Sequence, residues 1–244
     1  MLESKAREIF ERLPATARVL DVGGGGSPFP RADYVLDLGS YESRARLGRL
    51  AIGCAERFTR ETWIRRDVCA REPWPFEDKF FDYAVCSHLL EDVRDPVWVC
   101  SELSRVARAG YIETPSRILE QSRGVEHPLY AGFYHHRWLV EARDGHLVFR
   151  HKPHSLHVLR EAIVADLGPA QRINPEYEFL TLEWEGTLPA AEVIEMDEQK
   201  VNEELCAFAR EARRRPRLVV NVSLPWRHKF ARTLYFWRLR RAAR

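Results

Sequence analysis

The stretch Val19-Leu20-Asp21-Val22-Gly23-Gly24-Gly25-Gly26 decides the fold of this chain. It opens with a compact apolar run that contains one acid, and four glycines follow at once. A parallel strand that is buried on both faces has this apolar character, and glycine allows the backbone to turn sharply where the strand ends. We therefore predict a buried strand over residues 19–22, followed by a tight turn.

Short apolar runs recur after this strand, and most of them are separated by stretches with helical spacing. The predicted strands cover residues 34–37, 63–67, 81–86 and 111–114, and the predicted helices cover residues 1–13, 44–60, 88–93 and 96–108. Strands that alternate with helices are typical of a parallel sheet with helices on both faces. We expect an α/β fold with a Rossmann-like, doubly wound sheet that is mostly parallel.

The second half of the chain carries antiparallel signals instead. Asp144-Gly145 lies between two apolar runs, which predicts an inserted hairpin. The further predicted elements are a helix over 155–167, late strands over 179–184 and 218–222, and a helix over 203–214. We expect one domain over residues 1–225, with a cofactor-binding half (1–120) and a substrate-side half (121–225).

The composition is that of an ordinary globular protein. Of 244 residues, 45% are hydrophobic and 30% are charged, which excludes the disordered and fibrous classes. No apolar stretch approaches the ~20 residues that span a bilayer, and the first residues lack the apolar core of a signal peptide, so we expect a cytoplasmic protein. The five cysteines form no Cys-x-x-Cys pair, so we expect neither disulfides nor a metal site.

The glycine turn fits one cofactor pattern and fails another. The dinucleotide fingerprint Gly-x-Gly-x-x-Gly fails in both registers, because its third glycine would fall at Pro28 or Phe29. The run from Asp21 to Ser27 resembles motif I of the class I S-adenosylmethionine-dependent methyltransferases, Asp/Glu-x-Gly-x-Gly-x-Gly, with Ser27 in place of the last glycine. The resemblance implies S-adenosylmethionine as the cofactor and S-adenosylhomocysteine as the product.

The resemblance continues in order over about the first 115 residues. It implies that Asp37 binds the ribose hydroxyls, and that Asp67 and Val68 contact the adenine. The runs 74–76, 81–91 and 102–115 are similar to the family's later motifs, although the last is shortened and Asp92 stands where a histidine is frequent. The cofactor contacts that the resemblance implies are Asp21, Gly23, Gly24, Gly25, Asp37, Leu38, Asp67, Val68, Ser87 and His88.

The link between the first two strands departs from the family pattern. Only residues 27–33, two of them prolines, separate Gly26 from Tyr34. A parallel crossover usually needs ~10 or more residues, so we expect no full helix here.

Two histidines are candidates for the base of the reaction. Methyl transfer needs a positioned nucleophile, and a histidine can take the proton of a hydroxyl acceptor. His88 follows the fourth strand and is the first candidate, with lining of the cofactor pocket as its alternative role. His135 lies in the aromatic, histidine-rich segment 124–138, which suits a sugar or phenol acceptor. The alternatives for this segment are a surface loop or a contact between copies in a homo-oligomer. A metal site at His127, His135 and His136 is disfavoured, because no helical His-x-x-x-His spacing or cysteine partner accompanies them.

The last residues, 226–244, predict a basic amphipathic helix. Trp226, Phe230, Leu234 and Trp237 are spaced along one helix face, with seven Arg and Lys and no acid around them. Such a helix either docks on its own domain or lies on an anionic membrane surface. No nucleic-acid recognition motif accompanies the charge, so we do not expect a nucleic-acid partner.

These features predict a methyltransferase that acts at oxygen on a small molecule or glycan. The alternatives are a nicotinamide-dependent oxidoreductase, which the missing glycine disfavours, and a non-catalytic cofactor-binding or interaction protein. The sequence names neither the acceptor nor the methylated atom.

Overall fold

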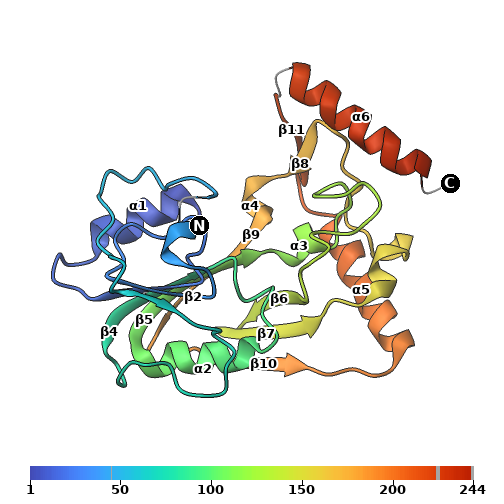
Figure 1. Ribbon diagram of the computed structural model, residues 1–244. Coiled ribbons are helices and arrows are strands. Elements are labelled where there is room, and N and C mark those ends of the chain that lie inside the picture. Colours follow the sequence, from blue (N-terminus) through green and yellow to red (C-terminus); the bar gives the residue numbers. More distant parts are fainter. Residues whose placement is uncertain (45, 224–225, 243–244) are drawn as a thin grey trace. The chain divides into compact units, whose positions relative to one another are not determined.

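A computed structural model describes residues 1–44, 46–223 and 226–242 (Figure 1). Its contacts divide the chain into two compact units. Unit 1 comprises Met1–Thr114, Ala142–Phe149 and Thr181–Glu192. Unit 2 comprises Pro115–Glu141, Arg150–Leu180 and Val193–Arg244. The first boundary falls close to the predicted division between a cofactor half and a substrate half.

The main sheet has six strands, five from the first half of the chain and one from the second. Its strands lie in the order β3 (Trp63–Arg65), β2 (Tyr34–Asp37), β1 (Val19–Val22), β4 (Phe81–Ser87), β5 (Ala107–Pro115) and β9 (Phe179–Glu185). The neighbours from β3 to β5 pair in parallel. Hydrogen bonds from Ser116 N to Glu178 O and from Gly186 N to Arg108 O give β9 the opposite direction. The predicted Rossmann-like, mostly parallel sheet is therefore confirmed.

Helices cover both faces of this sheet. On one face α1 (Glu3–Arg12) packs Ala6 and Ile9 against Val19, Val35 and Tyr83. Successive strand residues point to opposite faces, so Leu20, Leu36 and Ala84 face the other side, where α2 (Pro96–Val106) lies (Figure 1). Asp95 caps α2 by accepting a hydrogen bond from Trp98 N, and Pro96 occupies the first turn, as helix starts favour.

Two of the four helices predicted in the first half are wrong, whereas those over 1–13 and 96–108 are present as α1 and α2. Among the described residues of 44–60, none is helical, and the nearest helical turn is η1 (Tyr41–Ser43). Gly48 and Gly53 adopt positive φ in this segment, and Ile52 and Phe58 join the core from irregular backbone. Residues 88–93 form turns. As predicted, the link 27–33 contains no helix.

The predicted hairpin is present. β6 (Trp138–Arg143) and β7 (His146–His151) flank Asp144-Gly145, and both turn residues have positive φ, as a tight two-residue turn of type I′ requires. A third strand, β10 (Ala190–Val193), was not predicted and pairs with β7.

Unit 2 contains mainly short elements around two small apolar clusters. The predicted helix over 155–167 is wrong, because two 3-10 helices, η2 (His154–His157) and η3 (Arg160–Ala162), stand there instead. The predicted helix over 203–214 is present as α5 (Glu198–Ala212). The late strand over 218–222 is present as β11 (Val219–Asn221), which pairs with the unpredicted β8 (Gln171–Ile173). Two short helices, α3 (Arg117–Glu120) and α4 (Pro175–Glu178), were also not predicted.

The last helix, α6, spans Trp226–Ala242, and residues 243–244 of the predicted helix lie outside the described residues. Of the four residues of the expected apolar face, the side chains of Leu234 and Trp237 are described, and those of Trp226 and Phe230 are not. Leu234 is half-buried and Trp237 is exposed. Among the described side chains of α6, the buried one is Phe236, on another side of the helix. No described helix is long and apolar enough to cross a membrane.

Candidate active site

A cavity of about 130 Å³ lies in unit 1 at the carboxyl ends of β1 and β4. After β1 the chain runs outward to β2 and β3, and β4 returns to the other side of β1. In open α/β sheets, ligands bind where the strand order reverses in this way. The cavity walls include Asp21, Gly23, Gly24, Ser87 and His88, which are five of the predicted cofactor contacts.

Asp21 is a buried carboxylate beneath the glycine turn. Its Oδ2 accepts a hydrogen bond from Phe29 N at 2.7 Å, and a Cβ on Gly24 would lie 2.4 Å from the same oxygen. Burial, together with the charge of nearby Asp37, raises the pKa of Asp21 to about 7, although the Phe29 N–H lowers it in part. A carboxylate in this state is stabilised by any cation that reaches it.

Asp37, at the end of β2, braces the same turn. Its Oδ2 accepts from Gly25 N at 2.9 Å and its Oδ1 from Gly39 N at 2.5 Å. Burial raises the pKa of Asp37 despite these two bonds. A carboxylate offers about four acceptor sites, so both oxygens retain capacity for ligand hydroxyls.

His88 follows β4 in an uncommon conformation. Its φ of 54° lies in the left-handed region, and its N–H donates to Glu113 O at 2.8 Å. The ring Nε2 lies 2.9 Å from Oε1 of Glu113, and Nδ1 lies 3.6 Å from Oε1 of Glu91. Burial alone would lower the pKa of His88, but the two carboxylates outweigh it and raise the pKa to about 9. The raised pKa favours the imidazolium form at neutral pH, whereas a general base must be neutral there.

Glu113 and Glu91 are buried acids that the sequence analysis did not single out as site residues. Glu113 also accepts from the Tyr111 hydroxyl at 2.6 Å and from Leu2 N at 3.0 Å. Burial would raise the pKa of Glu113, but His88 and the other donors lower it to about 2. Oε2 of Glu91 has no hydrogen-bond partner among the described residues. The sequence does contain a signal for Glu113, because a charged residue inside the apolar run of β5 indicates a buried acid.

Asp67 and Val68, beyond the end of β3, do not line this cavity. Oδ2 of Asp67 pairs with Arg94 at 2.7 Å, and Oδ1 accepts from Cys69 N. The Cys69 N–H and the Arg94 guanidinium lower the pKa of Asp67. Val68 is buried, and its carbonyl accepts from the Trp74 indole.

Two exposed leucines flank the glycine turn. Leu38 follows Asp37 directly, and the Leu47 side chain covers Gly26, where a Cβ would meet it at 2.8 Å. Among the described residues of unit 1, these are the large apolar side chains that remain exposed, at 68% and 85%. Leu38 was predicted as a cofactor contact, but no sequence signal indicated Leu47.

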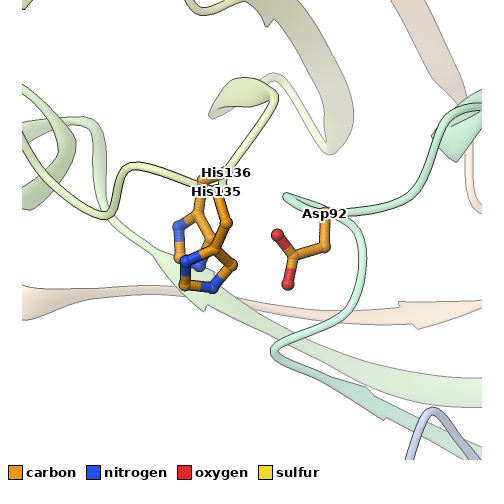
Figure 2. Close-up of side chains that lie close together, drawn as sticks. All are labelled: Asp92, His135 and His136. Atoms are coloured by element: carbon orange, nitrogen blue, oxygen red, sulfur yellow. The ribbon is translucent and has the colours of Figure 1, made fainter.

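His135, the second predicted base, belongs to unit 2. Its ring lies edge-on to His136 with centroids 4.5 Å apart, and both rings are drawn in Figure 2. His136 is buried and its Nδ1 lies 2.7 Å from Oε1 of Glu120, whereas His135 is 47% exposed. Glu120 also pairs with buried Lys152 at 2.6 Å.

Comparison with protein families supplies the identification. Residues 46–112 match the family model described as a methyltransferase domain. Over these residues, the chain is similar to a methyltransferase domain. The match runs from the segment before β3 to β5, so it includes Asp67, Ser87 and His88 but not Asp21 or Asp37. S-adenosylmethionine is the cofactor of such a domain.

Several solved structures are similar to the chain. An S-adenosylmethionine-dependent methyltransferase from Mesorhizobium loti is 23% identical, over 62% of this chain and 67% of that one, with a TM-score of 0.35. One from Thermotoga maritima is 18% identical, over 48% and 51%, with a TM-score of 0.34. The N-terminal domain of EvdMO1, solved with S-adenosylhomocysteine and D-fucose, is 17% identical, over 85% and 71%, with a TM-score of 0.35.

At these identities and TM-scores, the likeness says nothing about activity or substrate. The chain spans about half the length of the first solved structures that it matches. Among curated proteins, no relative matches.

The residues that line the cavity fit S-adenosylmethionine in chemistry. A buried carboxylate faces the cavity, Gly23 and Gly24 leave no room for a side chain, and Phe29 and Val85 form apolar parts of the wall. The volume of about 130 Å³ is below the ~300 Å³ at which pockets for drug-sized ligands begin. Binding therefore requires part of the wall to move, and the exposed Leu47 side chain is the part with the least packing to lose.

Proposed function

We propose that this protein is an S-adenosylmethionine-dependent methyltransferase that binds its cofactor at the β1/β4 cavity. The observation that carries the proposal is the buried carboxylate of Asp21 beneath the glycine turn, at the point where the strand order reverses. The strands that follow match the methyltransferase domain family, which supports the same reading.

S-adenosylmethionine supplies an electrophilic methyl group on a sulfonium when it is bound. Asp21 holds the ammonium of the cofactor, because this carboxylate gains most from a cation. The Asp37 carboxylate accepts hydrogen bonds from the ribose hydroxyls. The hydrogen bonds that it accepts from Gly25 N and Gly39 N hold the carboxylate in a fixed orientation. Gly23, Gly24 and Gly25 let the backbone approach the ligand, and Leu38 packs on the nucleoside.

Asp67 and Val68 serve the adenine end of the cofactor in this proposal. Arg94 and the Cys69 N–H orient the Asp67 carboxylate, which leaves lone pairs on both oxygens for an amino group.

Ser87 and His88 form the β4 wall of the pocket. The imidazolium of His88 is held between Glu113 and Glu91, so it acts as a fixed donor and positive charge rather than as a base. This assigns His88 the pocket-lining role that was the alternative to catalysis.

The acceptor is a small molecule or glycan that is methylated at oxygen, in the cytoplasm. With His88 charged, His135 is the remaining candidate for the base. It stands on an aromatic segment with Phe133 and Tyr134, and its ring is half exposed. Flat aromatic surfaces beside a histidine suit a sugar or a phenol.

The test uses the full chain with S-adenosylmethionine that carries a labelled methyl group. Cell extracts and a panel of sugars and phenols are added in turn, and label transfer and S-adenosylhomocysteine release are both measured. The proposal predicts equal amounts of transferred label and released product with at least one acceptor class. His135→Ala should abolish transfer while leaving cofactor binding intact.

Two results would favour the rival functions. Oxidation or reduction of a substrate with NAD, without label transfer, would indicate the nicotinamide oxidoreductase. Cofactor binding with no turnover in any extract would indicate a binding protein.

A further inference from the structure

The strongest concentration of charge in the chain lies at α6 and the segment before it. Between residues 212 and 242 there are ten Arg and Lys and no Asp or Glu, and six of these ten lie within α6. The helix follows the β8–β11 ribbon of unit 2 (Figure 1). The proposed methyl transfer gives no role to this run of positive charge.

Burial tells which side of α6 faces outward. Phe236 is 4% exposed, whereas its neighbours Tyr235 and Trp237 are 49% and 55% exposed. Because consecutive helix residues are about 100° apart, the side opposite Phe236 presents Leu234, Arg238 and Arg241. Both arginines are exposed and Leu234 is half-buried. Two arginines therefore stand on the outer face with an aromatic ring on each flank.

The contacts within this face match a water–lipid boundary. The Arg241 guanidinium lies 5.2 Å from the centre of the Trp237 ring, which brings charge and ring together on the surface. Tryptophan and tyrosine favour the headgroup level of a bilayer, and arginine can place its stem in the apolar layer while its charge stays wet. Anionic headgroups attract each basic residue near the surface.

We propose that the outer face of α6, formed by Leu234, Tyr235, Trp237, Arg238 and Arg241, binds the surface of an anionic phospholipid bilayer. The apolar area that it can insert is small, so the attachment is mainly electrostatic and reversible. Salt weakens it, because the charges remain in contact with solvent. This proposal is independent of the methyltransferase activity, and the face lies outside the cofactor cavity.

The experiment is co-sedimentation of the full chain with vesicles. One set contains phosphatidylcholine alone, and the other also contains phosphatidylglycerol. The chain should sediment with the anionic vesicles at low salt, be released at high salt and ignore the neutral ones. Arg238→Gln/Arg241→Gln should weaken the binding roughly 25-fold, or roughly 5-fold per arginine.

A matched control removes the same charge elsewhere in unit 2. Arg160 and Arg210 are both exposed, and Arg160→Gln/Arg210→Gln should leave vesicle binding within about 2-fold of the unchanged chain. Glutamine has nearly the helix propensity of arginine, so α6 should remain folded, which circular dichroism checks.

Three results would overturn the proposal. The first is a chain that ignores anionic vesicles at low salt. The second is an equal loss in both double variants, which would indicate only net charge. The third is tight binding to RNA or DNA that Arg238→Gln/Arg241→Gln removes, without vesicle binding. S-adenosylhomocysteine affinity should be the same in all variants, so failure here is distinct from failure of the proposed activity.

Discussion

Nε2 of His88 lies 2.9 Å from Oε1 of Glu113, and this pair joins the ends of β4 and β5 beside the cavity. The same carboxylate accepts from Leu2 N, which ties the start of α1 to the cavity wall. Because Glu113 is buried and His88 carries the positive charge, the pair fixes the ring in a charged state. A charged ring is a poor proton acceptor, which favours the pocket-lining role proposed for His88 over the predicted role as a base.

Glu113→Gln should shift the titration of His88. We expect the midpoint to fall from about 9 toward the ordinary histidine value of ~6.5, since the main partner of Nε2 becomes neutral. The free energy of unfolding should drop by about 2 kcal/mol at pH 7, the scale of a hydrogen bond to a charged group. Nuclear magnetic resonance of the His88 ring and denaturant unfolding measure the two effects.

The pH dependence of stability follows from the same pair. The pKa of His88 is higher in the folded state than in the unfolded chain, so its contribution is complete below pH ~6.5. It should be lost as the pH rises through about 9. A variant with Glu113→Gln should lack this loss, and an unchanged slope between pH 6.5 and 9 would contradict the ion pair.

Asp21→Asn should stabilise the fold and weaken cofactor binding. Because burial raises the pKa of Asp21 to about 7 from the ordinary value of ~3.9, the carboxyl group destabilises the folded state progressively above pH ~4, and this loss is complete above about pH 7. Asparagine should raise the free energy of unfolding by about 2 kcal/mol at pH 8 and lower S-adenosylhomocysteine affinity about 10-fold. Asp78→Asn, at an exposed aspartate, is the matched control. Equal changes of S-adenosylhomocysteine affinity and of unfolding free energy in the two variants would refute the assignment of Asp21.

Gly24→Ala should disrupt the turn that holds the ligand. The added Cβ would lie 2.4 Å from Oδ2 of Asp21, so the carboxylate must move. We expect loss of S-adenosylhomocysteine binding in a calorimeter. Gly53→Ala is the control, since its φ of 79° is strained but nothing lies within 4 Å of the new Cβ. It should cost about 1 kcal/mol of stability without changing affinity.

Glu120→Gln should destabilise unit 2 by about 3 kcal/mol, because it leaves the buried ammonium of Lys152 without its counter-charge. Adding Lys152→Met should recover most of that loss, which unfolding by urea can measure. A double variant no more stable than the single one would show that the ion pair is not the cause.

The sheet could be predicted from the sequence because buried parallel strands are continuous apolar runs. Residues 19–22 and 34–37 matched the observed strands, and Asp144-Gly145 marked the β6–β7 hairpin, which belongs to a second sheet. The helix predicted over 44–60 failed because glycines at positions 48 and 53 break the backbone while Ile52 and Phe58 still reach the core. The spacing of apolar residues indicates which side chains are buried. In this segment, Ile52 and Phe58 are buried although the backbone is not helical.

The site residues at the ends of strands could be predicted from the sequence, because the order of the strands places them. The site residues that come from irregular segments could not. Asp21, Ser87 and His88 stand at strand ends and reach one cavity. The charge of His88 could not be predicted, because it arises from Glu113 on another strand. Leu47 comes to Gly26 from an irregular segment that carries no periodic signal.

The most direct test of the central claim is a calorimetric titration of the full chain with S-adenosylhomocysteine, repeated with NAD. The account predicts one S-adenosylhomocysteine bound per chain, sharply weakened by Asp21→Asn, and no heat from NAD. Saturable NAD binding with no response to S-adenosylhomocysteine would contradict it.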